Sequence, residues 1–239
     1  EIVLWFEHDL YDQTMLMYLL TELSKKEFRT LSMVTINEFP GIEPFYGLGQ
    51  LSSQQLEELF YIKKQAISAD QINEAITGWR AYTSKNPTDI EKWLASCTQK
   101  LPFLKTALQS HLSYFPSKYT GLNEVETLVV DYIDENTCSF AQLFQIISKH
   151  RINDGIGDLY FAAMLNELMK GSTPLLESDY PLPNYQNAKP VSQLKLTSYG
   201  LRFLKSQRGH LEIDRDWWIG GVYLTEDQWF WDGKVLIQK

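Results

Sequence analysis

The most constraining feature of this chain is a bare apolar segment that ends abruptly in polar residues. The segment Ile2–Phe6 is continuously apolar, which is typical of a strand buried on both faces of a parallel sheet. A helical pattern of apolar residues follows from about Leu10 to Lys26, and a second apolar segment, Leu31–Ile36, comes after a short turn. We therefore predict a β-α-β unit whose two strands are parallel.

Polar side chains follow both predicted strands at the point where each strand ends. They are Glu7, His8, Asp9, Asp12 and Gln13 after the first strand, and Asn37 and Glu38 after the second. In open α/β sheets, ligands bind just beyond the carboxyl ends of the strands. We therefore expect these residues to form a small-molecule or nucleotide-type site, with Arg80 as a partner for an anionic group.

Two interpretations of the His8–Gln13 segment remain open. His8 could be a general acid or base, or a metal ligand, with Asp12 orienting it from four residues away. In the structural alternative, Asp9 caps the helix, Asp12 complements the helix dipole and His8 bonds a neighbouring loop. A metal site generally needs three or four ligands, so we predict no metal here. The sequence identifies no cofactor, and Asp9 joins His8 and Asp12 as a candidate catalytic residue.

Composition limits the class of protein. The chain has 239 residues, is 44% hydrophobic and carries a net charge of −8, which is typical of a soluble globular protein and argues against acidic partners. Its two cysteines show no metal or disulfide spacing, and no segment approaches the roughly 18 apolar residues of a membrane span. We expect a cytoplasmic location and no membrane partner. Because Glu1 leads directly into a core strand, we also expect a longer protein of which this is the C-terminal part.

Residues 42–120 show helical periodicity, so we assign residues 1–120 to one α/β domain with a helical extension. The domain would contain an incomplete Rossmann-like parallel sheet, since two strands are too few for a stable sheet. The sheet should therefore have an open edge. The segment Gly47-Leu48-Gly49-Gln50 precedes a helix, as phosphate loops do, but it lacks the spacing of known phosphate motifs, and we favour an ordinary turn.

Residues 121–210 read as three helices, two strands and a final helix beginning at Thr197-Ser198-Tyr199-Gly200, a pattern that predicts a winged-helix-like domain. The domain contains 8 Lys and Arg against 10 Asp and Glu. DNA binding needs a positive surplus of charge, so we do not expect DNA as a partner and favour a protein partner or self-association. The predicted recognition helix, Asp158–Lys170, should instead pack its apolar side chains inward.

Residues 211–239 alternate and are rich in aromatic side chains, which predicts a C-terminal β-meander. Asp232-Gly233 is the strongest hairpin signal in the chain. Gly220-Gly221, inside the predicted strand Ile219–Leu224, indicates a bulge or a close approach of another backbone or a ligand. We expect the tryptophans of this tail to pack in a small core rather than to stack on nucleic-acid bases.

Several longer motifs resemble one family. They are V-L-W-F-E-H-D-L-Y-D-Q at 3–13, F-P-G at 39–41, G-L-G-Q-L at 47–51, W-R-A-Y-T-S-x-x-P at 79–87, L-P-F-L at 101–104, F-P-S at 115–117, G-L-N-E-V-E at 121–126 and W-I-G-G-V-Y-L at 218–224. Together they resemble the bacterial proteins built on domain of unknown function 1835. The resemblance implies a preceding segment whose strands would complete the sheet, and it brings no established activity.

Two functional hypotheses follow. In the first, the ends of the first strands bind a small molecule or nucleotide, with or without catalysis. In the second, the chain is a regulatory protein whose winged helix binds DNA or a protein partner.

Overall fold

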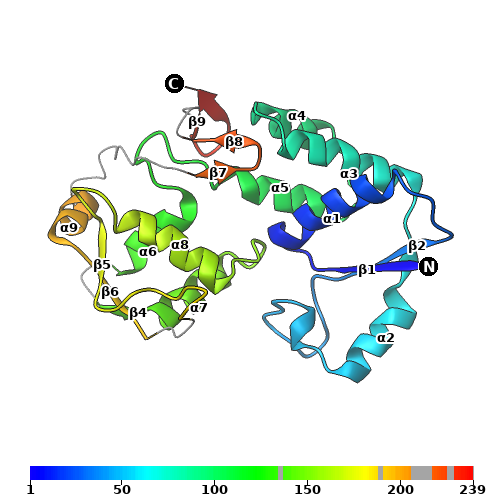
Figure 1. The fold of residues 1–239 in the computed structure, drawn as a ribbon, viewed down its shortest axis with the longest axis horizontal. Helices are drawn as coiled ribbons and strands as arrows, with labels where there is room; N and C mark the ends of the chain where they lie inside the picture. The colour runs from blue at the N-terminus through cyan, green and yellow to red at the C-terminus, as the bar shows by residue number, and fades with distance from the viewer. Residues whose placement is uncertain (134–136, 188–190, 206–216, 225–228, 239) are drawn as a thin grey trace. The chain divides into compact units, whose positions relative to one another are not determined.

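The computed structural model describes residues 1–239 except 134–136, 188–190, 206–216, 225–228 and 239 (Figure 1). Contacts within the chain separate two compact units. The N-terminal unit comprises Glu1–His111 together with Ile152–Gly155 and Gly220–Val222. The C-terminal unit comprises Leu112–Arg151, Ile156–Ile219 and Tyr223–Lys239. The predicted boundary between residues 210 and 211 lies outside the described residues.

The N-terminal unit begins with the predicted β-α-β arrangement. Strand β1 (Ile2–Phe6) pairs in parallel with β2 (Leu31–Thr35), and Phe6 lies beside Thr35 in the register. Helix α1 (Leu10–Leu23) connects the two strands. The sequence prediction of two parallel strands joined by a helix is therefore confirmed, although α1 ends three residues before Lys26.

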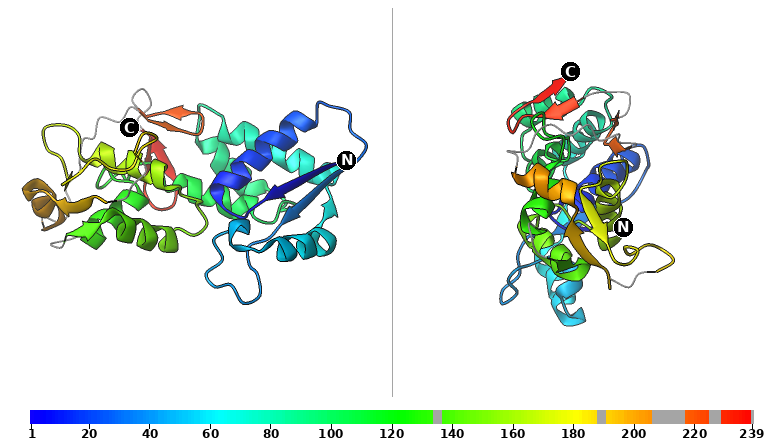
Figure 2. Two further views of the ribbon diagram at one scale, coloured as in Figure 1. Left: turned by 60° about the horizontal axis from the view of Figure 1, so that its bottom comes forward. Right: turned by 90° about the vertical axis from the view of Figure 1, so that its left-hand side faces the viewer.

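The sheet of the N-terminal unit is mixed rather than all parallel. A short strand, β3 (Gln65–Ala66), pairs antiparallel with β2, so the strand order is β1-β2-β3. Two residues are too few to produce a periodic pattern, and the sequence prediction missed this strand. Among the described residues β1 pairs with β2 alone, so one edge of the sheet is open as expected. Helix α1 lies on one face of the sheet and α2 (Ser53–Lys63) on the other (Figures 1 and 2).

The rest of the N-terminal unit is mainly helical. A 3-10 turn, η1 (Leu48–Gln50), precedes α2, and α3 (Ala69–Tyr82), α4 (Thr88–Ser96) and α5 (Leu104–Leu112) follow. Helices α2 and α3 each begin with a capping box. The side chain of the N-cap serine accepts from the backbone N–H of a glutamine three residues later, and the side chain of that glutamine accepts from the backbone N–H of the serine. Most of the regular structure between residues 42 and 120 is thus helical, as predicted, with loops between the helices and β3 as the one strand.

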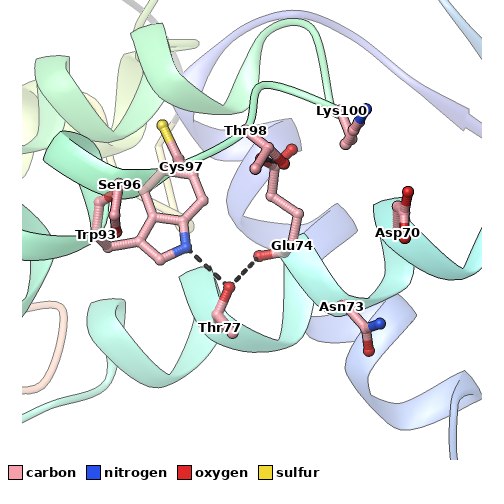
Figure 3. A pocket seen from close by; sticks show the side chains of 9 residues that line it. All are labelled: Asp70, Asn73, Glu74, Thr77, Trp93, Ser96, Cys97, Thr98 and Lys100. Atoms are coloured by element: carbon pink, nitrogen blue, oxygen red, sulfur yellow. Dashed lines mark hydrogen bonds between the residues drawn. The ribbon is translucent and has the colours of Figure 1, made fainter.

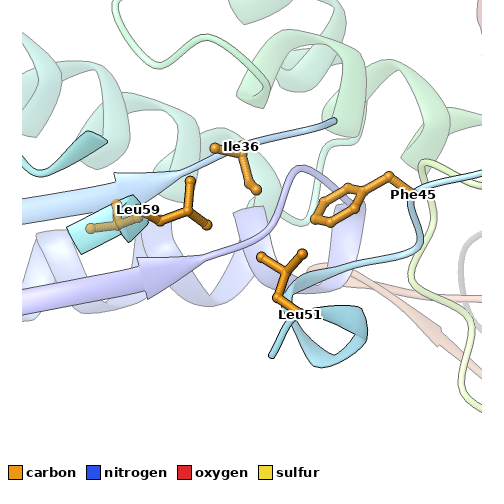
Figure 4. Close-up of a cluster of buried hydrophobic side chains, with 5 residues drawn as sticks. Ile36, Phe45, Leu51 and Leu59 are labelled. Carbon is orange, nitrogen blue, oxygen red and sulfur yellow. The ribbon is translucent and has the colours of Figure 1, made fainter. Parts of the chain in front are cut away.

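A buried cluster fixes the loop that follows β2 (Figure 4). Ile36 and Phe45 pack with Leu51 and Leu59, and all four side chains are buried together with Val34. Burying such side chains contributes about 1.5–3 kcal/mol each. The cluster therefore holds the loop leading into η1 against the carboxyl end of β2.

The C-terminal unit combines helices with a small antiparallel sheet. Its elements are α6 (Glu124–Ile133), β4 (Cys138–Ser139), α7 (Phe140–His150), α8 (Asp158–Leu168), β5 (Leu176–Ser178), β6 (Gln193–Leu196) and α9 (Ser198–Lys205). The strand order is β4-β6-β5, with both pairs antiparallel. The sequence prediction placed β5 and β6 and missed β4, which has only two residues.

The tail forms two separate two-stranded sheets rather than one meander. Strands β7 (Trp218–Ile219) and β8 (Val222–Tyr223) form one, and β9 (Trp229–Trp231) and β10 (Leu236–Gln238) form the other. The turn after β7 is made by Gly220, whose φ of 58° is unfavourable for other residues, so the predicted strand is divided there. Residues 211–216, 225–228 and 239 of the predicted meander lie outside the described residues.

The Asp232-Gly233 turn between β9 and β10 is confirmed. Its Asp232 carboxylate accepts from the backbone N–H groups of Lys234 and Val235 at 2.9 and 2.8 Å. Gly233 has a φ of 95°, which the turn requires. The predicted close approach at Gly220-Gly221 is also present, because the Gly221 N–H donates to the Tyr82 carbonyl at 2.9 Å. Within the described part of the chain, no helix combines the length and apolar character that crossing a membrane requires.

Candidate functional site

The turn from β1 into α1 is held by two side chains of the predicted site. The side-chain amide of Gln13 donates to the Glu7 carbonyl at 2.6 Å, and the Asp12 carboxylate accepts from the Glu7 N–H. Gln13 is only 1% exposed. Both residues therefore fix the backbone that carries Glu7 and His8, and their polar atoms are directed at the chain itself.

Asp9 is the N-cap of α1 and is buried. Its carboxylate accepts from the Asp12 N–H at 2.8 Å, and the Leu10 N–H donates to the Asn153 carbonyl at 2.8 Å. Burial raises the pKa of Asp9 to about 6, with the nearby carboxylates of Asp12 and Asp154 adding to the increase. The backbone hydrogen bonds to its carboxylate only partly offset this effect. Asp9 thus has a pKa close to neutral pH.

Glu7 points to the loop that the sequence marked as glycine-rich. Its carboxylate accepts from the Leu48 N–H at 2.6 Å. A Cβ on Gly47 would lie 2.0 Å from Glu7 Oε2, so only glycine allows this approach without displacing the carboxylate. Burial raises the pKa of Glu7, while the Leu48 hydrogen bond lowers it and Asp12 and Asp9 raise it further. The loop therefore binds an anion, and that anion is the chain's own carboxylate.

His8 lies in an aromatic environment with an unsatisfied nitrogen. Its ring centroid lies 6.3 Å from that of Phe45 and 6.1 Å from that of Phe103. The residue is 6% exposed, and its Nδ1 has no hydrogen-bond partner among the described residues. Burial lowers the pKa of His8, and Asp12 opposes this by its charge. The expected pairing of His8 with Asp12 is thus electrostatic, because the Asp12 carboxylate bonds the Glu7 backbone instead.

The other predicted residues are less closely connected to this group. Asn37 and Glu38 follow β2 at the same edge of the sheet, since β1 and β2 are parallel and in register. Both side chains are exposed, and in the described part of the chain neither has a hydrogen bond or ion pair with residues 7–13. Arg80 is exposed in the last turn of α3, likewise without a described bond to them.

A distant segment completes the site, and the sequence prediction missed it. A Cβ on Gly155 would lie 2.5 Å from the Asp9 Cγ, and Gly155 has a φ of 63°. Beside it, the Asp154 carboxylate accepts from the Ser110 hydroxyl. The Asp154-Gly155 pair is a recognisable turn signal, but nothing in a single sequence connects that turn with Asp9.

The arrangement supplies hydrogen-bond acceptors and, in Asp9, a carboxyl group whose pKa is raised to about 6. Among the described residues, no three histidine, cysteine or acidic side chains are placed to hold a metal ion. The free amides at the start of α1 are used by Asp9 and Asn153, so they do not offer a phosphate site. Compared with models of protein families, with curated proteins and with solved structures, the chain matches none.

Proposed function

We propose that the carboxyl end of β1 binds a small molecule, with Glu7, His8 and Asp9 as the contacting residues. The observation that carries the proposal is the buried Nδ1 of His8, which has no hydrogen-bond partner among the described residues. More than 90% of buried polar groups in native proteins have such a partner. A ligand hydroxyl or amine at Nδ1 would provide it, at the edge of the sheet where α/β proteins bind ligands.

The surrounding charges favour a neutral or cationic group of the ligand at this point. Glu7, Asp9 and Asp12 interact electrostatically with one another, and each additional negative charge would meet repulsion. If the ligand is a nucleotide, its base or ribose would lie here rather than its phosphates. Asn37 and Glu38 are proposed to contact the ligand from β2, and Arg80 to pair with a distant anionic group.

The site also suits proton transfer. A general base works best when its pKa is close to the operating pH, and the pKa of Asp9 is raised to about 6. His8 stays neutral at pH 7 because burial lowers its pKa, so its imidazole can accept or donate a hydrogen bond. Asp9 is proposed as the group that exchanges a proton with the ligand, and His8 as the group that positions it.

Replacing His8 with phenylalanine tests this proposal. Phenylalanine preserves the contacts with Phe45 and Phe103 and removes the unsatisfied nitrogen, so we expect His8→Phe to fold with at least the wild-type stability. Nucleosides, nucleotides, sugars, polyamines and divalent ions are screened by thermal shift on the full chain. A compound that stabilises wild type and the surface variant His150→Gln but not His8→Phe supports the site. The proposal is wrong if stabilising compounds act equally on all three proteins, or if none stabilises wild type.

The finer architecture of the N-terminal unit is also a proposal. A parallel β1-β2 pair joined by α1 supports the incomplete Rossmann-like interpretation, although β3 adds an antiparallel strand. The resemblance to proteins built on domain of unknown function 1835 agrees with it through the segment that contains Glu7–Gln13. Family membership on this basis remains our proposal and adds no activity.

A second candidate function concerns the C-terminal unit. We propose that residues 121–210 form a winged-helix-like domain, supported by the order α6-β4-α7-α8-β5-β6 and by the strand order β4-β6-β5. Helix α8 occupies the place of a recognition helix. Phe161, Met164, Leu165 and Leu168 are buried in it, and Leu159 is half-buried. Those side chains are therefore used for packing.

The charges on α8 favour a protein partner over DNA. The helix carries Asp158 and Glu167 and no lysine or arginine. Non-specific DNA binding depends on cationic side chains that replace counterions. We expect no saturable binding to duplex DNA near 150 mM salt in a mobility-shift titration up to about 10 μM protein, a concentration within the range of typical non-specific dissociation constants at this salt. Saturable binding in the low micromolar range with a steep salt dependence would instead favour a DNA-binding regulator.

A further inference from the structure

A cavity lies within the N-terminal unit and is lined by none of the residues that the proposed function uses (Figure 3). It is a cavity of about 470 Å³ between one face of α3 and the end of α4 with the segment that follows. This volume is within the range of small-molecule sites. The lining residues are Asp70, Asn73, Glu74, Thr77, Trp93, Ser96, Cys97, Thr98 and Lys100.

The wall of the cavity is fixed by internal hydrogen bonds. The buried Glu74 carboxylate accepts from the Leu101 N–H at 2.7 Å and from the Thr98 hydroxyl at 3.0 Å. The Trp93 indole N–H donates to the Thr77 hydroxyl at 3.0 Å, and that hydroxyl donates to the Glu74 carbonyl at 3.0 Å. Because these bonds join α3, α4 and the segment after α4, the cavity is pre-formed, which reduces the entropic cost of binding.

The rim of the cavity carries an acidic and a basic side chain that form no ion pair with each other among the described residues. Asp70, Asn73 and Lys100 are exposed, and within the described residues their side chains have no hydrogen bond or ion pair. The Gln71 side chain donates to the Lys100 carbonyl at 3.2 Å, which places Lys100 by the first turn of α3, where Asp70 lies. In Figure 3 these three rim residues stand on one side of the cavity, and Trp93, Ser96 and Cys97 on the other.

We propose that this cavity binds a small zwitterion, a free α-amino acid or a short peptide. The ammonium group of the ligand would pair with Asp70 and with the side-chain oxygen of Asn73, and its carboxylate would pair with Lys100. Charge-assisted hydrogen bonds of this kind are about twice as strong as neutral ones. The ligand side chain would then extend toward Trp93 and Cys97. This site is separate from the one at the end of β1 and does not depend on it.

Charge-matched ligands and variants test the proposal. The full chain is titrated calorimetrically with each of the common L-amino acids and with L-leucyl-glycine, and each ligand that binds is compared with its carboxamide and its N-acetyl form. Lys100→Gln is expected to weaken the zwitterion about tenfold and to leave the carboxamide unchanged. Asp70→Asn is expected to weaken the zwitterion about tenfold and to leave the N-acetyl form unchanged. Lys85→Gln, at an exposed lysine outside the cavity, serves as the control.

The proposal is wrong if no amino acid or dipeptide binds to the wild-type chain. It is also wrong if the Asp70→Asn and Lys100→Gln variants bind the zwitterion as tightly as wild type does. Since both side chains are exposed and make no described bonds, neither substitution should unfold the chain.

Cysteine alkylation gives an independent readout of occupancy. Cys97 lines the cavity and is partly exposed, whereas Cys138 is buried in the C-terminal unit and serves as an internal reference. At ten times its dissociation constant, a bound amino acid should slow iodoacetamide modification of Cys97 about tenfold, measured by mass spectrometry. An unchanged rate at Cys97, or an equal slowing at Cys138, contradicts binding at this site.

Discussion

Helices α1 and α3 begin with different chemistry, although each must satisfy the same free amides. At α3, Ser68 accepts from the Gln71 N–H at 3.2 Å, and the Gln71 side chain accepts from the Ser68 N–H at 2.9 Å. At α1 the cap is Asp9, a carboxyl that is 6% exposed, with Glu7 and Asp12 beside it. A serine cap buries no charge, whereas an aspartate cap in this position is costly. The comparison supports the proposal that the start of α1 does more than cap a helix.

The tightest part of this arrangement is the contact between Asp9 and Gly155. Gly155→Ala would place a Cβ 2.5 Å from the Asp9 Cγ at a φ of 63°, and we expect a loss of about 3 kcal/mol in the free energy of unfolding. Gly171→Ala is the matched control, because Gly171 also has a positive φ, 82°, but its Cβ would meet nothing within 4 Å.

The Gly171→Ala control should lower the free energy of unfolding by about 1 kcal/mol, because only backbone strain acts on it. Urea denaturation of both variants measures the difference. Equal losses would mean that the Asp9 carboxylate is free to move aside, and the comparison between the two helix starts would lose its basis.

The next largest effect is the pH dependence of Asp9→Asn. The folded-state pKa of Asp9 is about 6, above its ordinary value of 3.8, so the native protein retains a proton that the unfolded chain loses between these values. The corresponding stability is present below pH 3.8 and is lost as the pH rises through 6. The loss amounts to about 3 kcal/mol. Asparagine keeps the cap and has no charge to bury.

We therefore expect Asp9→Asn to gain about 2 kcal/mol relative to wild type between pH 4 and pH 7, measured by urea denaturation at each pH. Ser68→Ala at the start of α3 should cost about 1 kcal/mol at both values, because no titrating group is removed. A stability difference between Asp9→Asn and wild type that does not change with pH would contradict the account of Asp9.

The sequence predicts the start of α1 well because its signals are local. The apolar run of β1, the capping position of Asp9 and the parallel pairing with β2 all follow from residues within 36 positions of one another. The same holds for Ser68 and for the Asp232-Gly233 hairpin. Short-range periodicity and turn chemistry determine these elements, so a single sequence contains them.

Long-range partners could not be predicted in the same way. Gly155 lies against Asp9 across 146 positions of sequence, and Phe103 lies beside His8 across 95. Gly47-x-Gly49 was recognised as a glycine-rich turn, but its partner, the Glu7 carboxylate, was not. The two-residue strands β3 and β4 were missed because so short a segment has no period. These partners and short strands are determined by tertiary contacts, and the local sequence pattern does not predict them.

A titration of Asp9 and His8 by NMR, following the side-chain carboxyl carbon and the imidazole ring, tests the central claim most directly. The claim is that the start of α1 holds its ionisable groups away from their ordinary pKa values. We predict a midpoint near pH 6 for Asp9 and one below 6.5 for His8. A midpoint below 4 for Asp9 would show an ordinary helix cap with an ionised carboxylate, and would contradict the claim.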